Sequence, residues 1–341
     1  MTAPDADQAP SLGWTVSATA QGKVNLHLAV GDRRPDGYHD LETVFQALDL
    51  TETVTLTVVG ACGPDEGPGD MVAGVTVTGR DAHLVPAGGR SGDIADNLAV
   101  RAVRAVAASG AASGAVDAAA PLPRIRIDID KGVPVAGGMA GGSADAAAAF
   151  LAARALLGSR HSDADLTALA ADLGADVPFC LLGGTALGQG RGDRLVPVMS
   201  RGTFHWALAT GARGLPTPEV FARLDEQRAA VATGGRPDVR TGGPTALQRA
   251  LVGGDPVALA ACLSNDLQAP AVSLRPELRR TLAASREAGA LGAVVSGSGP
   301  TVAMLCRDRE HAVDVATAVA ASGDAGSTLV AASSPHGARL C

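Results

Sequence analysis

The chain has 341 residues and a formal net charge of −7, and 46% of its residues are hydrophobic, which excludes global disorder. Only 2% are aromatic and no block of Lys or Arg stands out, which argues against nucleic-acid partners and a membrane anchor. Five scattered cysteines without a Cys-x-x-Cys pair indicate free thiols in a reducing compartment. With an acidic start and no apolar span, we expect a cytoplasmic protein.

Strand patterns dominate the first half of the chain. A disordered leader over 1–12 precedes 14–30, which fits either a strand pair or one long strand bent around Gly22. In chain order we then predict strands over 52–59 and 72–78, a helix over 95–107, a flexible connection over 109–120 and a strand over 124–130. Helices over 143–157 and 163–173 and a short strand over 179–187 follow.

The pattern restarts around 197–204, and we therefore predict domains over 1–198 and 199–341. Strands come first and helices mix with strands later, which favours an α+β fold over a repeating βαβ sheet. In the second half we predict strands over 205–210, 292–296 and 302–306, helices over 217–228, from about 245, from about 255, over 276–288 and over 310–321, and a mobile loop over 229–244.

A glycine-rich loop runs from Pro134 into an alanine-rich helix. Such a loop presents free backbone amides at the positive end of a helix dipole, which suits an anion such as a phosphate. Alternatively, the glycines let the helix pack closely on a sheet. The Walker pattern fails because no lysine precedes Ser143, and the dinucleotide pattern fails because Ala136 or Ala140 replaces a required glycine.

The loop resembles the phosphate loop of the GHMP kinases, which include galactokinase, homoserine kinase and mevalonate kinase. Gly142-Ser143 stands where most of the family has Ser-Ser, and this departure resembles one branch, whose substrate is a cytidine-diphosphate-linked alcohol of the non-mevalonate isoprenoid pathway. Gly22, inserted before Lys23, and Ala140, in place of a loop glycine, depart from the family pattern. Five further segments resemble the same branch: Ala20–Leu26, Arg34–Thr43, Leu173–Phe179, Pro216–Phe221 and Ser264–Leu267.

The resemblance implies a two-domain α+β fold with the active site in the interdomain cleft. The N-terminal domain would be like ribosomal protein S5 domain 2, and the C-terminal domain would be ferredoxin-like. It also implies ATP, bound as Mg-ATP, with Asn97 near the adenine; a helix N-cap is the other role open to Asn97. The residues implied to hold ATP phosphates are Pro134, Val135, Ala136, Gly137, Gly138, Met139, Ala140, Gly141, Gly142 and Ser143, with Ser143 the best hydroxyl for phosphate or Mg²⁺.

Asp176 and Lys23 are the implied catalytic pair. Asp176 lies on a turn after Gly174, where a turn-forming aspartate is the alternative, and the resemblance makes it the base for the acceptor hydroxyl. A lysine on an apolar strand needs a partner, and the charge of Lys23 would stabilise the developing alkoxide. Asn25 lies on the same strand face as Lys23 and is expected to fix the substrate or the lysine.

The resemblance implies that Tyr38 and His39 bind the acceptor. Tyr38 would stack on the cytosine ring, and His39 would hydrogen-bond the edge of that ring. Phe221 is either the opposite wall of that stack or a helix core residue, and Thr217 would contact the diphosphate. The expected partners are therefore ATP and a small cytidine diphosphate substrate, with the protein a monomer or weak homodimer. Other acceptors, a silent nucleotide-binding protein and a nicotinamide oxidoreductase are the alternatives.

Overall fold

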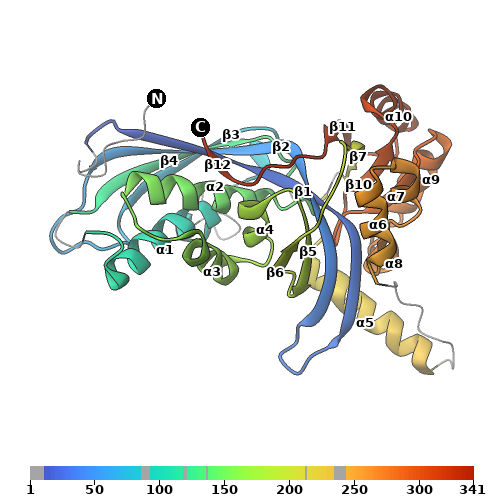
Figure 1. Ribbon diagram of the computed structural model, residues 1–341, viewed down its shortest axis with the longest axis horizontal. Helices are drawn as coiled ribbons and strands as arrows, with labels where there is room; N and C mark the ends of the chain where they lie inside the picture. Colours follow the sequence, from blue (N-terminus) through green and yellow to red (C-terminus); the bar gives the residue numbers. More distant parts are fainter. Residues whose placement is uncertain (1–10, 86–92, 118–120, 136, 212, 234–242) are drawn as a thin grey trace.

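The structure is a computed structural model that describes residues 11–85, 93–117, 121–135, 137–211, 213–233 and 243–341. Two β-sheets form its framework, and helices cover them (Figure 1). The larger sheet is built from two long strands near the N-terminus, which Figure 1 draws in blue running through most of the molecule. The smaller sheet and most of the helices of the second half of the chain lie at one end of the molecule, on the right of Figure 1.

The first sheet is centred on the antiparallel pair β1 (Thr15–Arg33) and β2 (His39–Ala61). Their pairing shifts register between Gln21 and Lys23, where Gly22 lies. A side chain at Gly22 would come within 2.9 Å of Val133, so the glycine lets β1 pass close to the segment before α2 (Gly141–Leu156). The main path of the sheet is β12 (Arg339–Leu340), β1 (Thr15–Arg33), β2 (His39–Ala61), β4 (Pro123–Lys131) and β3 (Val72–Gly79), with β5 (Thr185–Gly190) on β2, β6 (Arg194–Pro197) on β5 and β8 (Ser264–Asn265) on β1.

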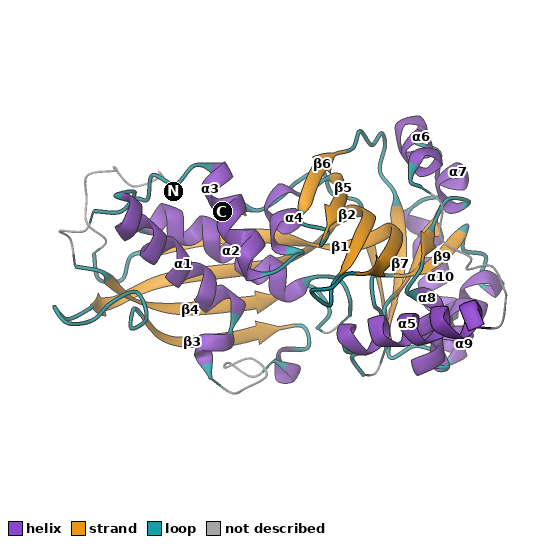
Figure 2. Ribbon diagram, turned by 90° about the horizontal axis from the view of Figure 1, so that it is seen from below, coloured by secondary structure: helices purple, strands orange, loops and turns teal. Residues whose placement is uncertain are grey.

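One helical layer covers a face of this sheet (Figure 2). The central helix of this layer, α2, is alanine-rich, and its small side chains let it lie against β1 and β2. The apolar faces of β2 and β4 are buried beneath it. Short 3₁₀ helices, η1 (Ala82–Leu84) and η3 (Ile94–Asp96), precede the layer. The helices are α1 (Leu98–Ser113), α2 (Gly141–Leu156), α3 (Asp163–Leu173) and α4 (Val177–Leu182).

The second sheet has the antiparallel order β11-β7-β10-β9. Along the described part of the chain, the first strand is followed by five helices and the short strand β8, then by two paired strands, one helix and the last strand, which is a ferredoxin-like order with an enlarged first helical segment. The elements are β7 (His205–Thr210), α5 (Thr217–Thr233), α6 (Thr245–Gly253), α7 (Pro256–Ala260), α8 (Gln268–Leu274), α9 (Glu277–Glu287), β9 (Gly292–Val295), β10 (Val302–Cys306), α10 (Arg309–Ser322) and β11 (Ser327–Ala332).

The predicted α+β class is confirmed, and of the two forms predicted for 14–30 the single long strand is correct. The strand predicted over 179–187 is correct only over 185–187, where β5 begins, and wrong over 179–182. There the chain forms α4, a helix that has Pro178 in its first turn and ends at Leu182. A short apolar run has no clear period, so helix and strand are indistinguishable there from pattern alone.

Two predicted connections are partly helical. α1 continues to Ser113, into the connection predicted over 109–120, and α5 continues to Thr233, into the loop predicted over 229–244. Residues 118–120 and 234–242 lie outside the described residues, as do residues 1–10 of the predicted leader. The strand β11 was not predicted. The division after residue 198 stays a prediction. In the part of the chain that the structure describes, no helix has both the length and the apolar character needed to cross a membrane.

Candidate active site

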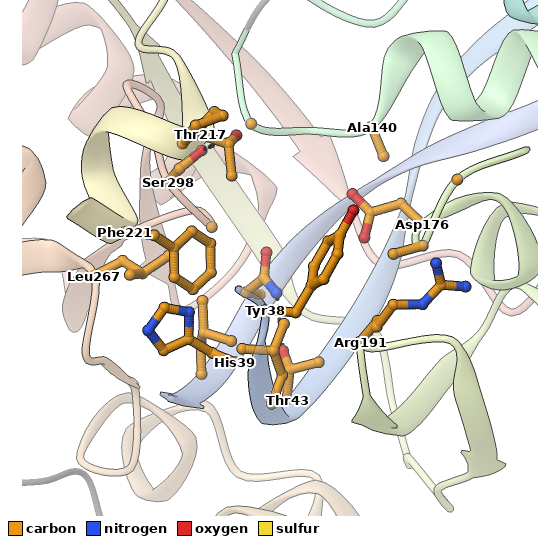
Figure 3. Close-up of a pocket in the computed structure, with 18 of the residues that line it drawn as sticks. Tyr38, His39, Thr43, Ala140, Asp176, Arg191, Thr217, Phe221, Leu267 and Ser298 are labelled. Carbon is orange, nitrogen blue, oxygen red and sulfur yellow. Dashed lines mark hydrogen bonds between the residues drawn. The ribbon is translucent and has the colours of Figure 1, made fainter. Parts of the chain in front are cut away.

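A cavity of about 770 Å³ lies where β1 and β2 meet the elements of the second sheet. Its walls come from these two strands, the glycine-rich loop before α2, the turn before α4, helix α5 and the turn between β9 and β10. Figure 3 shows Asp176 on one side of this space, His39 and Phe221 on the other, and Tyr38 between them. Segments far apart in the sequence therefore converge on one solvent-accessible space.

Lys23 and Asp176, the predicted catalytic pair, meet in this cavity. Lys23 Nζ lies 3.6 Å from Asp176 Oδ2, and the lysine side chain is 5% exposed against 35% for the aspartate. Asp176 is the residue that precedes α4, yet its side chain makes no capping hydrogen bond. The carboxylate is thus directed to the lysine and the cavity, which argues against the turn-forming role.

A chain of hydrogen bonds holds Lys23 in place. Lys23 Nζ donates to Asn25 Oδ1 at 2.8 Å, Asn25 Nδ2 donates to Thr43 Oγ1 at 2.8 Å, and Thr43 donates to the carbonyl of His27 at 2.7 Å. Lys23 Nζ also donates to the Gly138 carbonyl at 3.1 Å. Of the two roles expected for Asn25, the structure places it on the lysine, and the lysine in turn contacts the glycine-rich loop.

The glycine-rich loop ends in the first turn of α2. Ala140, the residue before the helix, has a φ of 62°, a left-handed conformation that glycine adopts without strain. The amides of Gly141, Gly142 and Ser143 start the helix and therefore lack acceptors within it. Ser143 and Ala140 line the cavity. These amides are therefore available to an anion, and phosphate binding at this end of α2 stays a prediction.

The rest of the predicted loop has mixed exposure. The side chain of Met139 is buried in the core, so only its backbone is available to a ligand. Gly138 packs against a second glycine-rich turn, residues 296–301 between β9 and β10, whose Ser296 Oγ donates to the Gly138 carbonyl at 3.2 Å. The remaining residues of the predicted loop come before Gly138 in the chain: the structure describes Pro134, Val135 and Gly137, and Ala136 lies outside the described residues.

A buried charged cluster lies beneath the first turn of α2. Lys131 Nζ is 2.8 Å from Glu52 Oε1 and 2.6 Å from Asp145 Oδ2, and the Glu52 side chain is fully buried. Burial, reinforced by Asp145, raises the pKa of Glu52 to about 8, and burial also raises the pKa of Asp145. Burial opposes the charge on Lys131, but the two carboxylates outweigh it and raise the pKa of Lys131. The cluster joins β2, β4 and α2, and its burial favours the protonated form of the two carboxyl groups.

The far end of the cavity contains the predicted acceptor-binding residues. The ring of His39 stacks on Phe221 with centroids 5.0 Å apart and an interplanar angle of 26°. Tyr38 is 59% exposed and lines the same cavity. Thr217 Oγ1 lies 2.8 Å from Ser298 Oγ, which ties α5 to the second glycine-rich turn. Phe221 lines the cavity and also packs against the core of the second sheet, so its core role is realised, and its stack on the cytosine ring stays a prediction.

Asn97 lies away from these groups. Its Oδ1 accepts a hydrogen bond from the Ala99 amide at 2.9 Å, so it is the N-cap of α1. It is not among the residues that line the cavity within the described part of the chain. The structural role open to Asn97 is therefore realised, and its contact with adenine stays a prediction.

Sequence reasoning missed three polar residues of the cavity and the buried cluster. Arg191, in the turn after β5, is held by Asp193 and by the Ala171 carbonyl, and its position depends on chain packing that no local pattern predicts. Asp225 follows Phe221 by four residues, so helical spacing puts both on one face of α5 and could have identified it. Ser298 belongs to the glycine-rich turn over 296–301, and its position in the cavity depends on how that turn packs against the first glycine-rich loop.

Comparisons with known proteins agree with this geometry. Residues 97–184 match the GHMP kinases N terminal domain, and residues 246–325 match GHMP kinases C terminal. The 4-diphosphocytidyl-2-C-methyl-D-erythritol kinases of Corynebacterium jeikeium and Nocardia farcinica are 51% and 50% identical, over 94% and 95% of this chain and 92% and 96% of theirs. The Mycolicibacterium smegmatis protein of the same name is 45% identical over 100% of this chain and 98% of its own.

Solved structures show the same relationship. A crystal structure of 4-(cytidine 5'-diphospho)-2C-methyl-D-erythritol kinase has a TM-score of 0.67 and 29% identity, covering 93% of this chain and 98% of its own. A homoserine kinase from Cytophaga hutchinsonii has a TM-score of 0.70 at 19% identity over 97% of this chain and 98% of its own, which shows a shared fold alone. The chain therefore belongs to the GHMP kinases, a family of ATP-dependent kinases of small molecules, and within them to the 4-diphosphocytidyl-2-C-methyl-D-erythritol kinases.

Proposed function

We propose that this chain transfers the γ-phosphoryl group of ATP to the 2-hydroxyl of 4-diphosphocytidyl-2-C-methyl-D-erythritol, giving the 2-phosphate and ADP in the non-mevalonate route to isoprenoid precursors. The names of its relatives support the substrate. The single observation that carries the proposal is the Lys23–Asp176 pair, which lies in a cavity with the start of α2 at one end and His39 and Phe221 at the other. This arrangement supports the binding of both substrates in one cavity, with proton removal between them.

In the proposed mechanism Asp176 is the base. The acceptor oxygen bonds to the γ-phosphorus while the bond from that phosphorus to the bridging oxygen of the β-phosphate breaks, and ADP leaves. Asp176 takes the hydroxyl proton in this step. The Lys23 ammonium stabilises the negative charge that develops on the acceptor oxygen, and Asn25 keeps the ammonium oriented. Transfer is direct, with no phosphoenzyme.

ATP is proposed to lie with its phosphates on the first turn of α2. The amides of Gly141, Gly142 and Ser143 would bind phosphate oxygens, and Asn97 would contact the adenine in addition to capping α1. Ser143 lines the cavity, and its hydroxyl would hold an oxygen-preferring ion such as Mg²⁺. Bound Mg²⁺ would neutralise charge on the transferred group.

The acceptor is proposed to lie at the other end of the cavity. Tyr38 and Phe221 would flank the cytosine ring, His39 would bind its edge, and Thr217 would contact the diphosphate. We further propose that the protein acts in the cytoplasm as a monomer or weak homodimer, with small molecules and not nucleic acids or membranes as partners. The net charge of −7 supports the absence of a nucleic-acid partner.

An ADP-release assay with purified full-length protein tests the proposal. The cytidylyl substrate should support steady ADP release, while its parent alcohol phosphate, 2-C-methyl-D-erythritol 4-phosphate, should support at most about 1% of that rate, because it lacks the groups that the far end of the cavity would bind. Homoserine and mevalonate serve as acceptors of the alternative family members. Equal rates with the parent alcohol phosphate, or a preference for homoserine or mevalonate, would refute the proposed substrate.

A further inference from the structure

An aspartate outside the predicted site holds the histidine at the acceptor end of the cavity. His39 begins β2, in the N-terminal half of the chain, and Asp225 lies on α5, in the C-terminal half. His39 Nε2 is 2.8 Å from Asp225 Oδ1, and the two side chains are 5% and 31% exposed. The hydrogen bond therefore crosses between the two halves of the molecule at the wall of the cavity.

The imidazole is fixed by two contacts in different directions. One is the hydrogen bond to Asp225, which lies in the ring plane, and the other is the stack on Phe221, which covers a ring face. Phe221 and Asp225 are one helical turn apart on α5, so a single rigid element makes both contacts. Rotation of the ring would break the hydrogen bond. The ring nitrogen opposite Asp225, Nδ1, consequently has one defined position.

Nδ1 is the nitrogen left for a ligand. Within the described residues, the hydrogen bond to Asp225 is the one that the His39 side chain makes, and His39 lines the cavity. An ionised aspartate accepts hydrogen bonds and has no proton to donate, so the neutral imidazole facing it carries its proton on Nε2. Nδ1 then presents a lone pair and acts as an acceptor. An amide or hydroxyl in place of Asp225 would impose no such choice.

We propose that Asp225 is a positioning residue that fixes the Nε2–H tautomer of His39 and thereby makes the cavity select cytosine over uracil. Cytosine carries an exocyclic amino group, a donor, where uracil carries a carbonyl, an acceptor. As an acceptor, Nδ1 takes a hydrogen bond from the amino group of cytosine. Opposite the carbonyl of uracil, the same nitrogen has no hydrogen-bond donor. This inference rests on the proposed function, because it concerns the base of the proposed acceptor.

The tautomer is tested first, without substrate or turnover. Nitrogen-15 NMR of uniformly labelled protein distinguishes protonated from unprotonated ring nitrogens, and the His39→Gln spectrum assigns the His39 signals among the seven histidines. The wild-type protein should show His39 protonated on Nε2 alone. Asp225→Asn, whose amide can either donate or accept, should show a mixture of tautomers. A proton on Nδ1 in the wild type, or an unchanged tautomer in a folded Asp225→Asn protein, overturns the proposal.

Selectivity is tested with the cytidine- and uridine-diphosphate forms of the same alcohol. The wild type should prefer the cytidine form in kcat/KM by about 10- to 100-fold, the range expected when a buried acceptor is left facing an acceptor. Asp225→Asn should reduce this ratio at least tenfold, mainly through KM for the cytidine form, and Asp225→Glu should restore much of it. Glu226→Gln, which alters an exposed neighbour on the same helix, should leave the ratio unchanged.

The outcomes separate this inference from the proposed function. If the wild type phosphorylates neither nucleotide-linked alcohol, the proposed function fails, while the NMR result on the His39 tautomer still stands or falls by itself. If the wild type is active and selective but a folded Asp225→Asn protein keeps the same ratio, the proposed function survives and the role of Asp225 is refuted.

Discussion

Lys23 Nζ lies 3.6 Å from Asp176 Oδ2, and the same ammonium donates to the carbonyl of Gly138 in the glycine-rich loop. The strand that carries the lysine thus contacts both the loop proposed to hold ATP and the carboxylate proposed to take the acceptor proton. Because Lys23 is almost fully buried, this geometry is held by the fold and does not depend on a flexible surface side chain.

Lys23→Met should lower kcat by about 10²- to 10³-fold, the effect of removing one group that stabilises charge in a transition state. Methionine keeps most of the aliphatic volume, so circular dichroism and the melting temperature should show a folded protein. Steady-state kinetics with ATP and the cytidylyl substrate measure the effect. A folded Lys23→Met enzyme within fivefold of wild-type kcat would remove the lysine from the proposed mechanism.

His39→Ala should act mainly on acceptor binding. The change removes the proposed hydrogen bond to the base and the stack on Phe221, so KM for the cytidylyl substrate should rise about tenfold or more. KM for ATP should change less than threefold, because His39 lies at the other end of the cavity. Equal changes in both KM values would indicate a general disturbance of the fold and contradict the assigned role.

Gly138→Ala should destabilise the protein by about 2–4 kcal/mol. Gly138 has a φ of 73°, and an added Cβ would lie 2.5 Å from the Ser296 carbonyl oxygen, so the two glycine-rich turns would be pushed apart. Gly142→Ala is the matched control, since its Cβ would meet only Leu98 Cδ1 at 3.7 Å. Urea denaturation measures both. Equal stability of the two variants would show that the contact between the turns is not tight.

Glu52→Gln tests the buried charged cluster through the pH dependence of stability. The pKa of Glu52 is raised from 4.5 to about 8 in the folded protein, so the folded state binds a proton that the unfolded state lacks between these values. The contribution of Glu52 is therefore fully present below about pH 4.5 and is lost as pH rises through about 8. The stability advantage of wild type over Glu52→Gln should shrink by on the order of 2 kcal/mol between pH 5.5 and 8.5.

Glu66→Gln provides a control of opposite sign. The Arg124 side chain lowers the pKa of Glu66, whose contribution is present above its ordinary pKa and is lost only as pH falls through the lowered value. The stability difference between wild type and Glu66→Gln should therefore stay constant from pH 5.5 to 8.5. If the Glu52→Gln difference is also constant over that range, the raised pKa of Glu52 is refuted.

The sequence predicted that Lys23 and Asp176 would lie together, but it misassigned or missed several elements around them. Both residues lie in short motifs whose order along the chain is specific. The strand Ser327–Ala332 was missed because its residues do not alternate between polar and apolar over enough positions. α4 was misassigned because a buried apolar run is compatible with either geometry, and the local signal that favours a helix is the single proline in its first turn.

Groups that are brought together only by tertiary packing could not be predicted from the sequence. Glu52, Lys131 and Asp145 belong to three different elements, and no local pattern shows that they meet beneath the first turn of α2. The pairing of His39 with Asp225 likewise depends on how α5 packs against the start of β2. Gly22 shows the converse: an inserted residue that looked like a departure from the family pattern lies at the register shift beside Lys23.

The most direct test of the account is the turnover of Asp176→Asn with saturating ATP and cytidylyl substrate. Asparagine keeps the size of the side chain, and Asp176 makes no capping hydrogen bond, so the protein should fold as the wild type does. We expect kcat to fall by about 10²- to 10⁴-fold, the range for a positioned base, with KM for ATP within about threefold of wild type. A folded Asp176→Asn enzyme that turns over at nearly the wild-type rate would contradict the account.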